Sequence, residues 1–270
     1  MILVALDLDG TALNSSGRLT RNVAEAIRQR AESKNYTFAF CSGRPMSGVS
    51  PHAQAVGIAD GYHVVANGAL VQNAGGEKLV EELLDFSEYQ ELTAFCQEVG
   101  LTCIAVNEQG AWTSFPTINL GTLEFCFLTN NQLTVCPIEK NAQNEKYSKL
   151  LICDNPDIIK QNKSQIEQRF SQQYSCVQGY PTMLEFSKKN VSKGNSLAEL
   201  ARYYGLSANE VFVVGDNGND LSSFELFSQS IAMGNATSEL KRAARWHCPT
   251  NDEDGVVKAL EIIDDFITGL

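Results

Sequence analysis

The sequence predicts an α/β protein, in which a doubly wound parallel sheet is interrupted by a second, inserted α+β unit. Short apolar segments rich in β-branched residues alternate with helical patterns over residues 1–80 and again over residues 187–270. Residues 81–186 lose this alternation and offer mainly strand candidates. Several core strand candidates lead straight into loops of Asp, Asn, Ser and Gly, and open α/β sheets bind ligands at such strand ends. We therefore expect two domains, 1–80 plus 187–270 and 81–186.

The core begins with residues 2–6, an uninterrupted apolar run that is typical of a strand buried on both faces. Thr20 can cap the next helix, whose apolar residues between Val23 and Ala31 recur on one face. Four more apolar segments are the remaining strand candidates of the core: 36–41, 63–66, 211–214 and 230–233. Four helical patterns lie in the second segment of the core: 194–204, 219–227, 238–246 and 255–267.

The inserted unit carries two helical patterns, one near residues 88–99 and one over residues 157–170. Five apolar segments are its strand candidates: 101–106, 111–115, 123–128, 149–153 and 183–186. Because strands outnumber helices and do not alternate with them, this part is expected to form an α+β domain.

Composition limits the classes of function. The chain has 270 residues, 43% of them hydrophobic, and a formal net charge of -11. Such an acidic surface repels phosphate backbones and anionic lipids, which argues against nucleic-acid and membrane-surface roles. No apolar run approaches the roughly 20 residues of a membrane-spanning helix, and the apolar start lacks the basic segment of a signal peptide. We therefore expect a cytoplasmic protein that acts on a small molecule.

The cysteines do not form a recognisable metal or disulfide framework. Eight are scattered along the chain without a CxxC pair, and three histidines are present. This pattern argues against a zinc site and favours free, buried thiols in a reducing compartment.

The first candidate loop is Asp7-Leu-Asp-Gly-Thr11, directly after the first strand. Two carboxylates spaced by two residues can face one site once the strand has ended. Gly10 permits the sharp turn, and Thr11 can form a hydrogen bond that holds an Asp in place. For this motif alone, an Asx-rich loop without chemistry is the plain alternative.

Two further loops offer groups for an anion. Ser42-Gly-Arg44 follows the second strand, and a hydroxyl with backbone N–H groups at a helix start can hold a phosphate. Lys193 stands in the first turn of a helix, where its charge opposes the macrodipole, so a nearby anion would explain it. Taken singly, an ordinary turn and a solvated lysine are the more common explanations.

The fourth loop, Gly215-Asp-Asn-Gly-Asn-Asp220, follows the strand candidate 211–214. Its carboxylate and amide oxygens suit a hard cation, chiefly Mg²⁺. The segment lacks the distal Glu of an EF-hand, which argues against a calcium loop.

Together the four loops supply the parts of a phosphoryl-transfer site: Asp7, Asp9, Ser42, Lys193 and Asp216. Uncatalysed phosphomonoester hydrolysis is among the slowest known reactions, and enzymes accelerate it by up to roughly 10²¹-fold. No single group provides this, so a nucleophile, a proton donor, a metal and fixed positive charge must act together.

This ordered set of motifs resembles the haloacid dehalogenase superfamily, across essentially the whole chain. Within it, the sequence looks like the Cof-type phosphatases, which have a Rossmann-like core and a large cap domain between the second and third motifs. The supporting segments are Asn67-Gly-Ala69, Leu184-Glu-Phe186, Val191-Ser-Lys-Gly194 and Asn251 to Val256. Within the cap, the resemblance rests on size and position.

The resemblance implies a Mg²⁺-dependent phosphatase that forms an aspartyl-phosphate. Asp7 would be the nucleophile and Asp9 the general acid and base. Mg²⁺ would be held by Asp7, the backbone carbonyl of Asp9, and Asp216. The phosphate-binding residues would be Leu8, Ser42, Gly43, Lys193 and Asn219. Three residues would support the site from behind: Thr11, Arg44 and Asp220.

Three questions stay open at this point. The substrate could be a sugar phosphate, pyridoxal phosphate or a nucleotide-like ester, because the cap selects the leaving group in the resembling family. A phosphomutase of the same superfamily is the nearest alternative, and a phospho-accepting signalling module is the alternative from another class. Oligomeric state cannot be read from the sequence.

Overall fold

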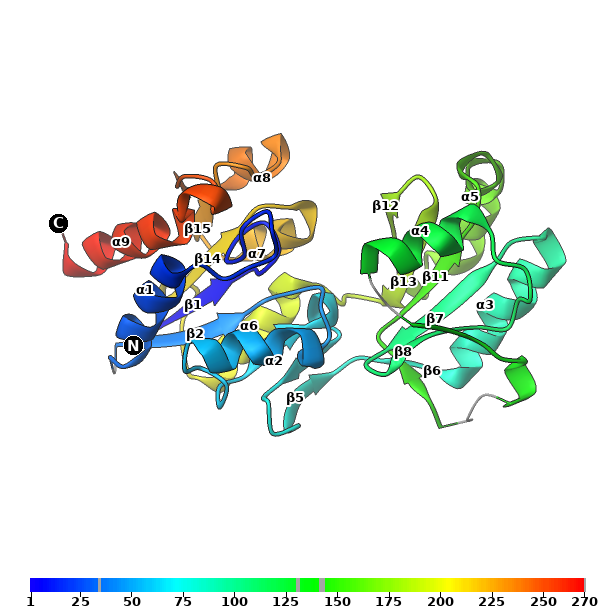
Figure 1. Cartoon of the computed structure of the whole chain (residues 1–270), viewed down its shortest axis with the longest axis horizontal. Coiled ribbons are helices and arrows are strands. Elements are labelled where there is room, and N and C mark those ends of the chain that lie inside the picture. The colour runs from blue at the N-terminus through cyan, green and yellow to red at the C-terminus, as the bar shows by residue number, and fades with distance from the viewer. Residues whose placement is uncertain (34, 130–131, 141–143, 270) are drawn as a thin grey trace. The chain divides into compact units, whose positions relative to one another are not determined.

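The computed structural model describes residues 1–33, 35–129, 132–140 and 144–269, and the chain divides into two compact units (Figure 1). Unit 1 comprises Met1–Glu81 and Ser192–Leu270, and unit 2 comprises Glu82–Val191. The second boundary lies beyond the expected residue 186, because strand β13 (Met183–Lys188) continues past that position.

Unit 1 is built on a five-stranded parallel sheet in the order β16-β15-β14-β1-β2. The strands are β1 (Ile2–Leu6), β2 (Tyr36–Phe40), β14 (Val211–Gly215), β15 (Gln229–Ala232) and β16 (Trp246–His247). Its α-helices are α1 (Arg21–Ala31), α2 (Met46–Ala55), α6 (Lys193–Tyr203), α7 (Leu221–Leu226), α8 (Ser238–Ala243) and α9 (Gly255–Thr268). The predicted doubly wound α/β core is confirmed.

Strand β1 lies between β14 and β2 in this sheet and fixes the position of the candidate loops. Residues Leu3 to Leu6 are fully buried, as their apolar run predicts. Leu6 pairs with Val214 of β14 on one side and with Phe40 of β2 on the other. Because all three strands run parallel, the loops that follow them emerge at the same edge of the sheet, where open α/β folds bind ligands.

The segment predicted as a strand at 63–66 forms β3 (His63–Val65), which belongs to a separate antiparallel sheet with β4 (Leu70–Gln72) and β5 (Lys78–Glu81). It meets the parallel sheet through a bridge between Cys41 and Val64. The backbone N–H of Ser42 donates to the carbonyl of Val64 at 2.9 Å. This contact places the end of β3 beside the loop that follows β2.

Unit 2 contains a six-stranded sheet in the order β12-β13-β11-β7-β8-β9. The further strands of unit 2 are β6 (Leu84–Asp85), β7 (Cys103–Asn107), β8 (Gly110–Thr113), β9 (Leu133–Val135), β10 (Lys146–Tyr147), β11 (Lys149–Cys153) and β12 (Tyr174–Tyr180). Strands β6 and β10 pair with each other outside the large sheet. Two predicted helices are present as α3 (Phe86–Val99) and α5 (Pro156–Phe170).

The large sheet of unit 2 is covered on both faces. Side chains of α3 and α5 cluster with alternate residues of the central strands, such as Cys103 and Leu150. The intervening residues, such as Ile104 and Leu151, cluster instead with Phe125 of a third helix, α4 (Leu120–Thr129). Successive strand residues point to opposite faces, so α4 covers the face opposite to α3 and α5.

The strand expected at 123–128 was wrong, because this segment lies within α4. A short apolar run does not distinguish a buried strand from a helix by periodicity. One local and one tertiary contact favour the helix: the side chain of Asn119 accepts from the N–H of Thr122 at 2.9 Å, and a Cβ on Gly121 would lie 2.6 Å from the backbone nitrogen of Asp154. Gly121 therefore lets the helix approach the end of β11 closely.

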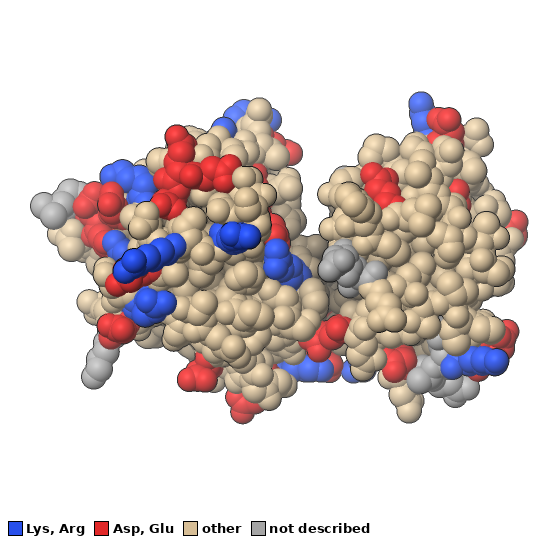
Figure 2. Space-filling view, viewed as in Figure 1, with Lys and Arg blue, Asp and Glu red and all other residues tan. Residues whose placement is uncertain are grey.

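Helix α4 is apolar on its outer side as well. Phe125 is buried, whereas Leu123 and Phe127 are 57% and 87% exposed. Figure 2 shows that the displayed face of unit 2 carries few charged side chains.

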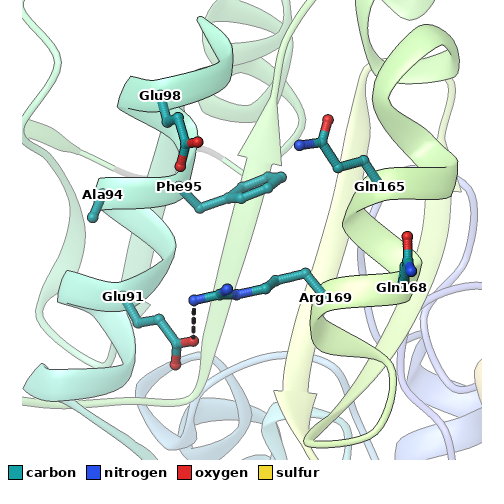
Figure 3. A pocket seen from close by; sticks show the side chains of 7 residues that line it. All are labelled: Glu91, Ala94, Phe95, Glu98, Gln165, Gln168 and Arg169. Atoms are coloured by element: carbon teal, nitrogen blue, oxygen red, sulfur yellow. Dashed lines mark hydrogen bonds and ion pairs between the residues drawn. The ribbon is translucent and has the colours of Figure 1, made fainter.

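A polar pocket of about 470 Å³ lies between α3 and α5 (Figure 3). Within it, Arg169 forms an ion pair with Glu91 at 3.4 Å, and Phe95 forms part of the wall. The pocket lies wholly in unit 2 and contains none of the residues singled out from the sequence.

The eight cysteines, all within the described part of the chain, are free. Among the described residues, every helix is too short or too polar to cross a bilayer.

Candidate active site

A cluster of three carboxylates lies at the carboxyl edge of the parallel sheet. Asp7 follows β1, while Asp216 and Asp220 belong to the loop after β14. One carboxylate oxygen from each lies within 4.8 Å of the others. Asp7 and Asp220 are buried, at 5% and 2% exposure. The two segments are neighbours because β1 and β14 are adjacent parallel strands.

Lys193 is the positive charge inside this cluster. Its ammonium nitrogen donates to Oδ1 of Asp7 at 2.6 Å and to Oδ1 of Asp220 at 2.7 Å. The residue opens α6 after the cap Ser192, whose side chain accepts from the N–H of Asn195. The Lys193 side chain is completely buried. The solvated-lysine alternative is therefore excluded, because the charge is paired inside the protein.

Asp220 orders the loop in which Asp216 lies. Its Oδ2 accepts from the backbone N–H groups of Asp216 and Asn217 at 3.0 and 3.2 Å, while Oδ1 accepts from Lys193. A Cβ on Gly215 would lie 2.5 Å from Oδ2 of Asp220, so this approach requires glycine. Both oxygens of Asp220 are thus already used within the protein.

Asp216 is held by residues of the first loop. Thr11 donates its hydroxyl to Oδ1 of Asp216 at 3.1 Å. Gly10 has a φ of +80°, and a Cβ at this position would lie 2.3 Å from Oδ2 of Asp216. The glycine therefore serves both the left-handed turn and the close approach of the carboxylate.

Asp9 lies at the exposed side of the loop and is paired with Arg44. The guanidinium donates through Nε to Oδ2 at 2.8 Å and through a terminal nitrogen to Oδ1 at 2.6 Å. The Asp9 side chain is 58% exposed. This two-pronged pair ties the loop after β1 to the loop after β2.

The other expected phosphate-binding residues surround the same edge. Ser42 is buried, and its Oγ accepts from the N–H of Arg44 at 3.2 Å. Gly43 is exposed, and Asn219 lies in the loop after β14. The side chain of Leu8 is fully buried, so only its backbone can face the site.

Two asparagines at this edge were not among the predicted site residues. Asn235, in the loop after β15, donates to the carbonyl of Gly10 at 2.8 Å and to Oδ2 of Asp216 at 3.5 Å. Asn67, in the loop after β3, accepts from Nδ2 of Asn219 at 3.1 Å. The sequence signal for Asn235 is its position three residues after the end of β15, and Asn67 belongs to the Asn67-Gly-Ala69 segment of the family resemblance.

Burial dominates the ionisation of the cluster. Desolvation raises the pKa of Asp7 well above its usual value, and the opposing attraction of Lys193 does not cancel it. Burial, together with the charge of Asp220, raises the pKa of Asp216 to about 6. The two carboxylates Asp7 and Asp220 raise the pKa of Lys193 despite its burial.

The donor set fits a hard divalent cation. Three carboxylates share one ammonium group, so the cluster carries excess negative charge that is removed from water. Each Asp216 oxygen accepts one hydrogen bond, at 3.1 and 3.5 Å, and the ammonium group of Lys193 donates to Oδ1 of Asp7, so both carboxylates keep lone pairs that could bind a cation. The oxygens of Asp220 accept three hydrogen bonds, from Lys193 and from two backbone N–H groups. Oxygen ligands without sulfur or imidazole are typical of sites for magnesium, calcium or manganese.

Comparisons with known proteins agree with this geometry. The family profile of haloacid dehalogenase-like hydrolases matches residues 4–260. A protein of Streptococcus pyogenes serotype M6, provisionally named a phosphatase, is 32% identical over 261 residues, which are 96% of each chain. YxeH of Bacillus subtilis, also provisionally named a phosphatase, is 30% identical over the same share of both chains.

A solved structure shows the same fold. The crystal structure of a haloacid dehalogenase-like hydrolase from Bacteroides thetaiotaomicron superimposes with a TM-score of 0.85 and 26% identity, and covers 97% of this chain and 99% of its own. The fold, the profile match and the relatives that span almost the whole sequence lead to one assignment. The chain belongs to the haloacid dehalogenase-like hydrolases and is a phosphatase of that family.

Proposed function

We propose that this phosphatase hydrolyses a small-molecule phosphomonoester through an aspartyl-phosphate on Asp7, with Mg²⁺ as its cation. The observation that carries the proposal is the position of Asp7: it directly follows β1, and its carboxylate lies 2.6 Å from Lys193 and within the carboxylate cluster that suits a metal. A buried carboxylate held by a fixed ammonium group is a preorganised nucleophile.

In the first half of the reaction, a carboxylate oxygen of Asp7 attacks phosphorus. The bond from phosphorus to the leaving-group oxygen breaks, and Asp9 gives its proton to that oxygen. Before this step Asp9 leaves Arg44 and takes up a proton from water, because both of its oxygens accept hydrogen bonds from Arg44 in this structure and the ionised carboxylate has no proton to give.

In the second half, Asp9 takes a proton from water, and the water oxygen attacks phosphorus. The bond between phosphorus and Asp7 then breaks, which regenerates the carboxylate and yields inorganic phosphate. Lys193 remains beside Asp7 in both halves, where it balances the charge of the carboxylate and of the phosphoryl oxygens. Ser42, the backbone of Leu8 and Gly43, and Asn219 hold those oxygens.

The proposed ligands of Mg²⁺ are the carboxylates of Asp7 and Asp216 and the backbone carbonyl of Asp9. When bound, the cation would reduce the repulsion between the attacking carboxylate and the phosphoryl group. Thr11 and Asn235 keep the Asp216 carboxylate in place for this purpose.

Unit 2 is proposed to be the cap domain that selects the leaving group. The support is the resemblance to Cof-type phosphatases and the position of the unit between the Ser42 loop and Lys193 in the sequence. The substrate class proposed is therefore broad: sugar phosphates, pyridoxal phosphate and nucleotide-like esters.

The test is phosphate release from p-nitrophenyl phosphate and from a panel of these esters, with Mg²⁺ or with EDTA. Asp7→Asn should lower kcat at least about 1000-fold, as expected for the loss of a nucleophile. Acid quenching with a ³²P-labelled substrate should trap label on the wild type and not on Asp7→Asn. Asp60→Asn, an exposed carboxylate elsewhere in unit 1, is the matched control.

Undiminished turnover by Asp7→Asn would contradict the nucleophile assignment. Activity that strictly requires a bisphosphate activator, without stoichiometric phosphate release, would instead identify a phosphomutase. Equal activity with Mg²⁺ and after complete removal of divalent ions would contradict the proposed cofactor.

A further inference from the structure

Three consecutive residues after β3 adopt left-handed backbone conformations. Ala66, Asn67 and Gly68 have φ angles of 50°, 55° and 98°. Left-handed conformations cost free energy for residues with a Cβ, and asparagine tolerates them better than most. A strained run of this kind persists only where surrounding contacts hold it, and such runs gather at functional sites.

On one side, the loop is held by contacts with residues of the candidate active site. The N–H of Ala66 donates to the carbonyl of Arg44 at 2.9 Å, and the N–H of Asn67 donates to the carbonyl of Ser42 at 3.0 Å. The backbone of the strained loop therefore lies against the turn that follows β2.

On the other side, the loop contacts the start of α6. Ser196 donates its hydroxyl to the carbonyl of Gly68 at 2.6 Å. A Cβ on Gly68 would lie 2.3 Å from the carbonyl oxygen of Ser192, the cap of the helix that carries Lys193. The loop thus joins the Ser42 turn to the helix start.

The side chain of Asn67 reaches a third loop. Its Oδ1 accepts from Nδ2 of Asn219 at 3.1 Å. The Asn67 amide also packs over Gly43, since a Cβ there would lie 3.0 Å from Oδ1 and 3.3 Å from Nδ2 of Asn67. One amide therefore lies between two of the groups expected to bind phosphate.

We propose that Asn67 is a positioning residue that fixes Asn219 relative to Gly43 and so sets the width of the phosphoryl-binding site. The inference rests on the proposed function, in which Gly43 and Asn219 contact the phosphoryl oxygens. Asparagine suits the position for two reasons: it accepts the left-handed conformation, and its side-chain oxygen is the acceptor for Asn219.

The test uses Asn67→Gly in the full-length protein. Glycine adopts a φ of 55° without strain, so the backbone is preserved while the amide is lost. Inorganic phosphate is the probe, measured as a competitive inhibitor of p-nitrophenyl phosphate hydrolysis. We expect its inhibition constant to rise roughly tenfold, the change that loss of one well-placed hydrogen bond produces. The melting temperature should stay within about 3 °C of the wild type.

Asn73→Gly is the matched control. It removes a half-buried amide from a turn in unit 1, where the Asn73 side chain forms hydrogen bonds with Glu77, and it should leave phosphate inhibition unchanged. An inhibition constant for Asn67→Gly equal to that of the wild type would overturn the proposal. If the wild type itself does not hydrolyse phosphomonoesters, the proposed function is wrong. That result is distinct from a failure of the proposal for Asn67, which is judged by comparing the variants with an active wild type.

A double-mutant cycle with Asn219→Ala tests whether Asn67 acts through Asn219, and it remains informative if Asn67→Gly is less stable than expected. The double variant should bind phosphate about as weakly as Asn219→Ala alone, because the role of Asn67 is lost with its partner. Multiplicative effects of the two substitutions would overturn the proposal.

Discussion

The ammonium nitrogen of Lys193 lies 2.6 Å from Oδ1 of Asp7, although 186 positions separate the two residues in the sequence. Asp7 directly follows the first strand of the chain, and Lys193 opens the helix that follows unit 2. The pair therefore joins the two sequence segments of unit 1 at the candidate active site, and we expect both stability and activity to depend on this contact.

Lys193→Met should destabilise unit 1 by about 3–5 kcal/mol, because it leaves Asp7 and Asp220 buried without a positive partner. It should also abolish detectable phosphatase activity. Urea unfolding measures the first effect and phosphate release the second. Lys78→Met is the control. The ion pair between Lys78 and Glu81 is partly exposed, so this substitution should lower the free energy of unfolding by less than about 1 kcal/mol. Equal losses in the two variants would contradict the prediction.

Gly10→Ala should disturb the site more than the fold. The φ of +80° adds strain, and the new Cβ collides with the Asp216 carboxylate, so we expect at least about a 100-fold loss of kcat/KM. Gly17→Ala, at a φ of +70° with nothing within 4 Å, carries the strain without the collision. That variant should lose about 1 kcal/mol of stability and keep its activity. If both variants lose activity alike, strain alone explains the effect.

The two faces of α4 should respond differently to truncation. Phe125→Ala removes a buried ring from the sheet-facing cluster and should cost about 3–5 kcal/mol. Phe127→Ala, two positions further along the same helix and 87% exposed, should change stability by less than about 0.5 kcal/mol. Chemical denaturation of both variants tests this. A large loss for Phe127→Ala would mean that its side chain is covered in solution.

His63 should make unit 1 less stable in acid. Burial lowers its pKa to about 4, from an ordinary value of 6.5, because the fold disfavours the imidazolium. The stability that the buried neutral imidazole contributes to the folded state is fully present above pH 6.5. It is lost as pH falls from 6.5 to 4, because the unfolded chain takes up the proton first. The loss should reach about 3 kcal/mol at pH 4.

His63→Gln isolates this effect. Its side-chain oxygen can replace Nδ1 as the acceptor for the N–H of Phe40, but it does not titrate. The difference in unfolding free energy between wild type and variant should therefore shrink by about 3 kcal/mol between pH 7 and pH 4. A difference that stays constant with pH would exclude His63 as the titrating group.

Much of unit 1 could be predicted from the sequence. The run at residues 2–6 indicates a strand buried on both faces, and parallel strands bring their following loops to one edge, which is why Asp7 and Asp216 could be placed together. Unit 2 was harder to predict. The strand predicted at residues 123–128 was wrong, because a short apolar run fits a strand and a helix equally well until its packing partners are known.

The sequence by itself determined the α/β core, the loops that carry the site and the family resemblance, since these depend on local periodicity and on the order of motifs. Only the tertiary structure decided that Lys193 is buried between Asp7 and Asp220, that Arg44 pairs with Asp9, and that Asn67 and Asn235 belong to the site. These contacts join residues far apart in the chain, and their partners are chosen by the packing of strand-end loops, which no local pattern encodes.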